Sequence, residues 1–281
     1  MERLKHLLLK GYVFLFARRG LYKFNRRLYL LSLHGMGILN SLTPRISGEA
    51  FFLQTLFRGR YTPRVVFDVG AHKGHYARMV RRLSPDAQVY AFEPHPTTFK
   101  ILQECAREYR FTAFPLGISD TKGKLTLYDH ADRDGSSHAS FYKTVIEELH
   151  GHRAVQHQVE VTTLDDFTAT HGVERIDLLK IDTEGNELRV LQGAGDLLRA
   201  GKIELVQFEF NETHLISRVY VKDFMDLLPE YDFWRLLPNG AILLNDTTPL
   251  HREIFAYQNI VACKKGTALI KSMHPFITKV E

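Results

Sequence analysis

The sequence predicts an α/β protein in which helices cover both faces of a mostly parallel β-sheet. From residue 65 onward, short runs rich in Val, Ile, Leu and Phe alternate with helix-like stretches, a pattern typical of strand–helix–strand units with parallel strands. Acids and glycines directly follow several of these runs, as expected where parallel strands end at a ligand site. The 281 residues, 44% of them hydrophobic, suffice for one large core and exclude a disordered chain.

The predicted elements follow one another in regular alternation. Strands are predicted at residues 65–69, 88–92, 111–118, 176–181, 205–210 and 260–263. Helices are predicted at residues 75–83, 97–109, 164–170, 185–200 (with glycine breaks) and 221–228. Two more strands are predicted around Asn239-Gly240, because this dipeptide favours the tight turn of a hairpin. Residues 124–163 interrupt the alternation, since strands at 124–128 and 159–163 enclose a polar, histidine-rich stretch that we interpret as an insert.

The N-terminal arm, residues 1–47, carries most of the positive charge. It contains nine Lys and Arg and one acid, a net charge of +8, whereas the rest of the chain has a net charge of −3. Its apolar runs are shorter than the ~18–20 residues of a membrane-spanning helix. We therefore expect a basic, amphipathic helical extension. It packs on the body or on a second subunit, or it lies on an anionic membrane surface; we expect no nucleic-acid partner.

Cysteine and histidine content limits the metal sites to be expected. The two cysteines, Cys105 and Cys263, exclude a disulfide framework and a site of four thiolates. Fourteen histidines are present, but none falls in a His-Glu-x-x-His pattern. A zinc site is therefore not expected.

Candidate ligand-binding residues lie where the predicted strands end. These segments are 68–74, 93–94, 118–120, 182–185 and 209–211, and four of the five contain acids. The glycine spacing Gly70-x-x-x-Gly74 is neither the dinucleotide fingerprint nor a Walker loop. Glu93, at the end of the second strand, is placed to bind the two hydroxyls of a ribose. The acids suit a cationic or polyhydroxylated ligand better than a phosphate.

An ordered set of motifs resembles a known family. The stretches are 66–76 (VFDVGAHKGHY), 91–94 (AFEP), 116–120 (LGISD) with Gly123, 161–165 (VTTLD) and 179–187 (LKIDTEGNE). Together they are similar to the FkbM-type S-adenosylmethionine-dependent methyltransferases. The resemblance implies a class I methyltransferase fold, Rossmann-like and three-layered, with a seven-stranded, mostly parallel sheet and one antiparallel edge strand. It covers about residues 60–265, within a predicted methyltransferase domain of residues 48–281.

The resemblance also assigns the cofactor site. It implies that Asp68, Gly70 and Ala71 contact the methionine end of S-adenosylmethionine, that Glu93 binds the ribose, and that Ser119 and Asp120 lie beside the adenine. The remaining residues of these motifs assigned to the cofactor are His72, Gly74, Tyr76, Pro94 and Asp182. The insert segment 134–140 (DGSSHAS) is similar to the acceptor side of the family's site, and it is placed over the pocket mouth.

The reaction needs a further group, because a sugar hydroxyl is a weak nucleophile that requires a base or a metal. The candidates for catalysis are Asp182, Glu184, Glu209 and His214. Glu209 and Asn211 lie two residues apart and so share one strand face. With Asp182 they form the candidate set for a divalent cation, although a metal is the less favoured alternative.

The resulting hypothesis is an O-methyltransferase that acts on a hydroxyl of a sugar, a glycan, a lipid-linked glycan or a related polyhydroxylated natural product. It would work in the cytoplasm, with peripheral contact at the inner membrane face through residues 1–47. Two alternatives remain open. One is a nicotinamide-dependent Rossmann oxidoreductase, which the glycine spacing disfavours. The other is a non-catalytic, membrane-associated binding protein. The presence of Asp68, Glu93 and Asp182 argues against it, because a protein without activity would not need all three acids.

Overall fold

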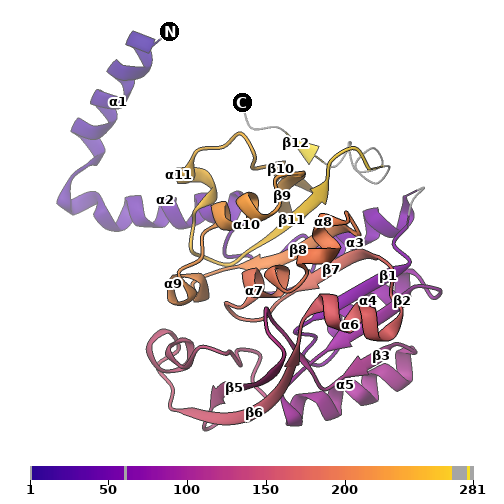
Figure 1. Cartoon of the computed structure of the whole chain (residues 1–281). Coiled ribbons are helices and arrows are strands. Elements are labelled where there is room, and N and C mark those ends of the chain that lie inside the picture. The colour runs from indigo at the N-terminus through magenta and orange to yellow at the C-terminus, as the bar shows by residue number, and fades with distance from the viewer. Residues whose placement is uncertain (1, 60–61, 268–276, 279–281) are drawn as a thin grey trace.

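Nine strands form the central sheet of the computed structural model, which describes residues 2–59, 62–267 and 277–278. The strands are β1 (Val65–Val69), β2 (Gln88–Phe92), β3 (Thr112–Phe114), β7 (Ile176–Ile181), β8 (Ile203–Phe210), β9 (Tyr231–Leu237), β10 (Gly240–Leu243), β11 (Gln258–Lys264) and β12 (Ile277–Thr278). Their order in the sheet is β12-β10-β9-β11-β8-β7-β1-β2-β3 (Figure 1). The predicted domain of residues 48–281 includes 268–276 and 279–281, which lie outside the described residues.

The α/β class and the mostly parallel sheet are confirmed, but the position of the antiparallel strand differs. Strands β3, β2, β1, β7 and β8 run parallel. The antiparallel strand β11 lies inside the sheet, because it pairs with both β8 and β9. The predicted hairpin at Asn239-Gly240 is confirmed, since Gly240 of β10 pairs with Leu237 of β9. This hairpin and β12 extend the sheet beyond the seven strands that we expected.

Two helical layers cover the sheet. One contains α3 (Glu49–Arg58), α4 (His75–Leu83) and α5 (Pro96–Tyr109), and the other contains α6 (Leu164–His171), α7 (Glu187–Gln192), α8 (Gly195–Arg199) and α10 (Val221–Leu227). Side chains alternate along each strand, so Val66 of β1 belongs to the core under the first layer and Phe67 to the core under the second. Two shorter helices, α9 (Thr213–Ser217) and α11 (Pro249–Arg252), lie in the connections that follow β8 and β10.

Two predicted elements are divided in the structure. The helix expected at 185–200 is interrupted between α7 and α8 at Gly193, where a Cβ atom would lie 2.1 Å from the carbonyl oxygen of Ser119. The strand expected at 111–118 divides into β3 and β4 (Gly117–Ile118). The second of these pieces leaves the central sheet and joins another sheet. The contact at Gly193 is distant in sequence, whereas Pro115, which has no N–H to donate, lies between β3 and β4.

The insert forms a separate three-stranded sheet with the order β4-β6-β5. Its strands β5 (Gly123–His130) and β6 (Ala154–Thr162) are antiparallel, and β4 pairs in parallel with β6. A π-helix, η2 (Val145–Leu149), lies in the connection between β5 and β6. In Figure 1 this sheet lies beside the central one, below the ends of its strands.

The N-terminal arm forms α1 (Glu2–Phe16), the 3-10 turn η1 (Arg19–Leu21) and α2 (Tyr22–Gly35). Figure 1 shows that α1 projects away from the body of the molecule. Many of its large apolar side chains are exposed, among them Leu8 and Phe14, whereas Leu33 near the end of α2 is buried. Among the described helices, none has the length and apolar character needed to cross a bilayer.

Candidate active site

The topology of the sheet places a crevice between β1 and β7. The chain proceeds from β1 outward through β2 and β3, and then returns to form β7 on the other side of β1. Ligands in open α/β sheets bind at such a reversal, beyond the carboxyl ends of the strands. The register pairs Val69 with both Phe92 and Ile181. The residues that follow these three strands therefore lie at one level.

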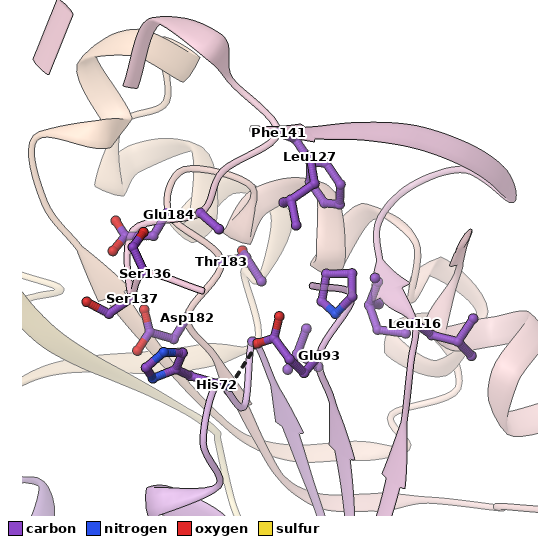
Figure 2. A pocket seen from close by; sticks show the side chains of 16 residues that line it. His72, Glu93, Leu116, Leu127, Ser136, Ser137, Phe141, Asp182, Thr183 and Glu184 are labelled. Atoms are coloured by element: carbon purple, nitrogen blue, oxygen red, sulfur yellow. Dashed lines mark hydrogen bonds between the residues drawn. The ribbon is translucent and has the colours of Figure 1, made fainter. Parts of the chain in front are cut away.

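A pocket occupies this crevice (Figure 2). Its lining comes from the end of β1 (Val69, Gly70, His72), the end of β2 (Glu93, Pro94), residues 116–118, the insert (Leu127, Ser136, Ser137, Ala139, Phe141) and the end of β7 (Asp182, Thr183, Glu184). Figure 2 shows a polar side with His72, Asp182 and Glu184, and an apolar side with Leu127 and Phe141. Glu93 lies between the two sides.

The loop after β1 approaches β7 closely at Gly70. This residue has φ +77°, and a Cβ atom there would lie 1.8 Å from the backbone oxygen of Asp182. Glycine is therefore required both by the left-handed backbone and by the close contact. Ala71 is buried and donates its N–H to the carbonyl of Phe92. Gly74 precedes α4, and its surroundings are the packed side chains of α5 and Phe111.

Glu93 presents a buried carboxylate to the pocket. Its two oxygens accept hydrogen bonds from the backbone N–H groups of His72 (2.9 Å) and His95 (2.8 Å). Burial raises the pKa of the Glu93 carboxyl to about 7. Each carboxylate oxygen can accept more than one hydrogen bond, so Glu93 could also accept bonds from two ligand hydroxyls.

Besides Ala71 and Gly74, four residues assigned to the cofactor lie outside the pocket lining. Asp68 is buried and accepts the N–H of Ala77 at 3.1 Å, and burial raises its pKa to about 7. The buried Tyr76 hydroxyl donates to Gln207 at 2.7 Å. Ser119 is buried and donates to Asp120 at 3.2 Å.

Asp120 in turn lies 3.3 Å from Arg189. The contacts described for Asp68, Tyr76, Ser119 and Asp120 are thus all made with other residues of this chain.

Lys180 is a buried cation beneath the pocket. Its Nζ lies 3.1 Å from Oδ2 of Asp182 and 4.0 Å from Oε1 of Glu49. The pKa of Lys180 is raised: burial lowers it, but the carboxylates of Asp182 and Glu49 more than compensate. The sequence analysis did not single out Lys180 or Glu49. The available signal was a lysine between apolar residues in a strand, IDLLKI, whose other charged residue is Asp177 near the strand start.

Glu184 lines the pocket in a strained backbone conformation, with φ +52°. Its Oε1 lies 3.2 Å from Nδ1 of His138, and its Oε2 accepts a hydrogen bond from Asn211 at 3.4 Å. Burial raises the pKa of Glu184. A non-glycine residue held at positive φ is typical of functional sites. His138 was not among the predicted site residues, although it belongs to the insert segment 134–140.

The candidate metal ligands Asp182, Glu209 and Asn211 are not arranged as a ligand set. Asn211 donates from its amide nitrogen to Glu209 at 2.6 Å. Its amide oxygen accepts bonds from the N–H and hydroxyl of Thr213 at 2.9 and 2.6 Å. Burial and the charge of Asp182 raise the pKa of Glu209 well above its usual value. Asn211 therefore has no free oxygen to offer a cation.

His214 does not line the pocket. It is buried, and its Nε2 lies 3.2 Å from Oε2 of Glu187. Glu187 in turn accepts the backbone N–H groups of Thr183 (2.7 Å) and Gly185 (2.9 Å). The geometry therefore connects His214 to the Asp182–Gly185 loop through Glu187, which the sequence analysis had not considered separately.

The insert closes the pocket from the other side. Asp129 accepts the backbone N–H groups of Gly135 (2.7 Å) and Ser136 (3.1 Å), which fixes the start of the 136–141 segment. The hydroxyl of Ser140 donates to the carbonyl of Glu184 at 2.8 Å. The segment expected over the pocket mouth thus contributes Ser136, Ser137 and Ala139 to its lining.

This strand order, with a close glycine turn after β1, a buried acid after β2 and acids after β7, fits the class I methyltransferase fold that the motifs implied. Within that class, residues 68–234 match the Methyltransferase FkbM domain. The chain belongs to this family, as the motifs predicted. The nicotinamide-dependent and non-catalytic alternatives are therefore set aside.

Three characterised relatives resemble the chain over much of its length. The 2-O-methyltransferase NoeI of Sinorhizobium fredii is 27% identical over 196 residues, which cover 65% of this chain and 79% of NoeI. The hexuronic acid methyltransferase AglP of Haloferax volcanii is 28% identical over 212 residues, 74% of this chain and 75% of AglP. The 31-O-demethyl-FK506 methyltransferase FkbM of Streptomyces tacrolimicus is 32% identical over 183 residues, 53% of this chain and 70% of FkbM.

Proposed function

We propose that this protein transfers a methyl group from S-adenosylmethionine to a hydroxyl of a sugar or a related polyhydroxylated molecule. The observation that carries the proposal is one pocket that combines Glu93 with Asp182 and Glu184 at the β1–β7 crevice. The polar side of the pocket, which includes Ser136 and Ser137, suits an acceptor rich in hydroxyls. Relatives named for a hexuronic acid and for 2-O and 31-O positions support the same chemistry.

The residues present fit the cofactor. Gly70 lets the loop after β1 pass close to the backbone of Asp182 at the edge of the pocket, and Glu93 offers its carboxylate to the ribose hydroxyls. Leu116, Leu127 and Phe141 supply an apolar surface for the adenine. S-adenosylmethionine supplies an electrophilic methyl group on a positively charged sulfur when it is bound. We assign Asp182, which lies 3.1 Å from Lys180, to stabilise positive charge in the pocket.

We assign Glu184 as the general base. Its pKa is raised, so the carboxylate is a better proton acceptor than an exposed glutamate. In the proposed step the acceptor hydroxyl would pass its proton to Glu184 while its oxygen takes the methyl group. The methyl–sulfur bond would break, and its electron pair would remain on the sulfur of the departing S-adenosylhomocysteine. His138, 3.2 Å from Oε1, and Asn211 hold the carboxylate in place. Residues 48–281 would form the catalytic domain, and the insert 124–163 would position the acceptor.

The test of the base compares Glu184→Gln with Asp226→Asn, an exposed acid on α10 that serves as the control. S-adenosylhomocysteine release is measured with glycosides, uronic acids and polyketide alcohols as acceptors, and cofactor affinity by calorimetry. We expect Glu184→Gln to lower kcat by about 10²–10⁴-fold while cofactor affinity stays near wild type. Undiminished turnover in Glu184→Gln would remove it from the mechanism.

The test of the cofactor site is Glu93→Ala. Losing a charge-assisted hydrogen-bond acceptor should weaken S-adenosylmethionine binding by about 1.5–3 kcal/mol. Glu104→Ala, an exposed acid on α5, is the control and should bind like wild type. Wild-type affinity in Glu93→Ala would show that the ribose binds elsewhere.

We further propose that the N-terminal arm binds the cytoplasmic face of an anionic membrane. The arm combines a net charge of +8 with exposed apolar residues on helices that project from the body, the composition of an interfacial anchor. Each basic residue near such a surface contributes about 1 kcal/mol. An enzyme held there would meet a lipid-linked glycan at a raised local concentration.

The anchor is tested on the full chain by sedimentation with phosphatidylglycerol vesicles. Replacing Arg18 and Arg19 by Gln should weaken binding about 30-fold, equivalent to about 2 kcal/mol. Replacing Lys100 and Lys122 on the body, both exposed, should have little effect. Equal pelleting of the two variants would contradict the anchor. So would self-association through the arm without vesicle binding.

A further inference from the structure

Four histidines of the insert gather beside the pocket, although they come from two separate stretches of the chain. Nε2 of His130 lies 3.3 Å from Nδ1 of His150. The rings of His130 and His152 stack with centroids 4.3 Å apart, and those of His138 and His150 are 4.6 Å apart. His138 also contacts Glu184 of the pocket. The cluster therefore joins the end of β5 to the chain that leads into β6.

An acid completes a possible ligand set. Oδ1 of Asp132 lies 3.6 Å from Nδ1 of His152. His130, Asp132 and His152 each offer one ligand atom, and these atoms lie within 4.8 Å of one another. In a tetrahedral site with metal–nitrogen distances of about 2.05 Å, neighbouring ligand atoms are about 3.3 Å apart. The separations of 3.3 Å between His130 and His150 and 3.6 Å between Asp132 and His152 lie near that spacing. The other distances must shorten by side-chain movement, because among these four residues only His130, Asp132 and His152 have ligand atoms that all lie within 4.8 Å of one another.

The facing ring nitrogens of His130 and His150 lie 3.3 Å apart. Imidazole binds a metal in its neutral form, and a shared cation would give these facing nitrogen lone pairs a common partner.

A second cluster in the insert is unsuited to a metal, although His95, Asp134 and His157 also offer converging atoms. Nδ1 of His95 accepts the backbone N–H groups of Thr97 (3.2 Å) and Thr98 (3.5 Å) at the start of α5. Its Nε2 must then carry the proton, and it lies 3.2 Å from Asp129. A protonated nitrogen cannot bind a cation.

We propose that His130, His150, His152 and Asp132 bind one divalent transition-metal ion of the zinc type. Three imidazoles and one carboxylate suit Zn²⁺, Co²⁺ or Ni²⁺, and they disfavour Mg²⁺ and Ca²⁺, which prefer oxygen ligands. The ion would tie residues 130–132 to residues 150–152. Because both stretches flank the segment that lines the pocket, metal binding would order the acceptor side. This site does not depend on the proposed acceptor chemistry.

The experiment titrates Co²⁺ and Zn²⁺ into the full chain, prepared without a polyhistidine tag and freed of metal by a chelator. Co²⁺ absorption reports the ligand geometry, and competition with a chromophoric chelator gives the Zn²⁺ affinity. We expect one equivalent per chain with a tetrahedral Co²⁺ spectrum. Zn²⁺ should also raise the thermal unfolding midpoint of the wild type.

The variants are His150→Gln and His152→Gln, with His251→Gln, an exposed histidine on α11, as the matched control. Each ligand variant should weaken Zn²⁺ binding by more than the roughly 10–100-fold that loss of an outer-shell group costs, and the control should bind like wild type. His150 is half-buried and His152 exposed, so the metal-free variants should unfold at the wild-type temperature.

Unchanged Zn²⁺ affinity in both ligand variants would overturn the proposal. Loss of binding in His157→Gln with retention in His150→Gln would overturn it too, because the other cluster would then hold the ion. Octahedral Co²⁺ bound in several weak equivalents would equally contradict a built site.

Discussion

Replacing Lys180 by Met tests the electrostatic arrangement beneath the pocket. Met has a similar length and fills the volume of the lysine stem, so the change removes the charge with little loss of packing. Lys180 is buried and lies 3.1 Å from Asp182 and 4.0 Å from Glu49. The charge of Lys180 also acts on the nearby carboxyl groups of Asp68 and Glu209. Lys180→Met therefore removes a buried positive charge from four acidic groups.

The size of the effect follows from these distances. With an effective dielectric constant of about 20, the two contacts contribute roughly 5 and 4 kcal/mol of attraction. The desolvation of Lys180 offsets much of this, and Asp182, 38% exposed, is partly screened by water. Removing one partner of a buried ion pair costs about 3–5 kcal/mol. We expect Lys180→Met to lose about 3 kcal/mol of unfolding free energy near pH 8.

The loss should depend on pH in one direction. Burial already raises the pKa of Glu49, and that of Asp68 to about 7, and removing the cation raises both further. The folded variant then binds more protons than the unfolded chain, so its stability falls as pH rises. The deficit relative to wild type should be largest near pH 8 and shrink toward about pH 5, where these acids are protonated when folded.

Urea unfolding near pH 5.5 and near pH 8 measures both effects. The matched control is Lys222→Met, because Lys222 and Asp226 form an exposed ion pair on α10. Exposed pairs contribute about 0–1 kcal/mol, with little change over this pH range. A deficit in Lys180→Met that equals the control, or one that grows as pH falls, would refute the reasoning.

Three further predictions concern the pocket itself. Gly70→Ala forces a Cβ to within 1.8 Å of the Asp182 carbonyl oxygen, so it should cost at least about 2 kcal/mol in urea unfolding and abolish cofactor binding; a variant as stable as wild type would contradict the close approach. Because the pKa of Glu93 is about 7, S-adenosylmethionine affinity should rise from about pH 6 to about pH 8 as its carboxylate ionises, and Glu93→Gln should flatten the calorimetric profile. His214→Gln should cost about 1–3 kcal/mol, since the buried Glu187 loses its partner, while the pH profile of turnover keeps its shape; a shifted profile would mean that His214 itself transfers a proton.

The sequence predicted best where local pattern alone decides the structure. The strands at 65–69, 88–92 and 176–181 are confirmed residue for residue. Short apolar runs bounded by turn residues are typical of buried strands. The glycine breaks expected in the helix at 185–200 are confirmed at Gly193, but the contact there with the carbonyl of Ser119, more than seventy positions away, could not be predicted. The internal position of β11 was missed for the same reason, because pairing order is a tertiary property.

In the candidate site, too, local patterns predicted individual residues but not the contacts between distant segments. Gly70, Glu93, Asp182 and Glu184 could be placed at one pocket because they follow parallel strands, whose ends share an edge. The contact between Lys180 and Glu49 joins the fourth parallel strand to a helix that precedes the first, and no short motif records it. The histidines of the insert were individually visible, yet their convergence depends on the pairing of β5 with β6.

The pocket residues come from two sheets, the central one and the separate β4-β6-β5 sheet. Gly70 and Glu93 belong to turns of the central sheet, where a change of backbone would disturb both cores. Ser136, Ser137 and Ala139 instead belong to a connection carried by a sheet with its own small cluster of apolar side chains. Such a connection can change in composition at little cost to the rest of the fold. One methyl-transferring core could in this way be refitted to new acceptors by changes confined to residues 136–139.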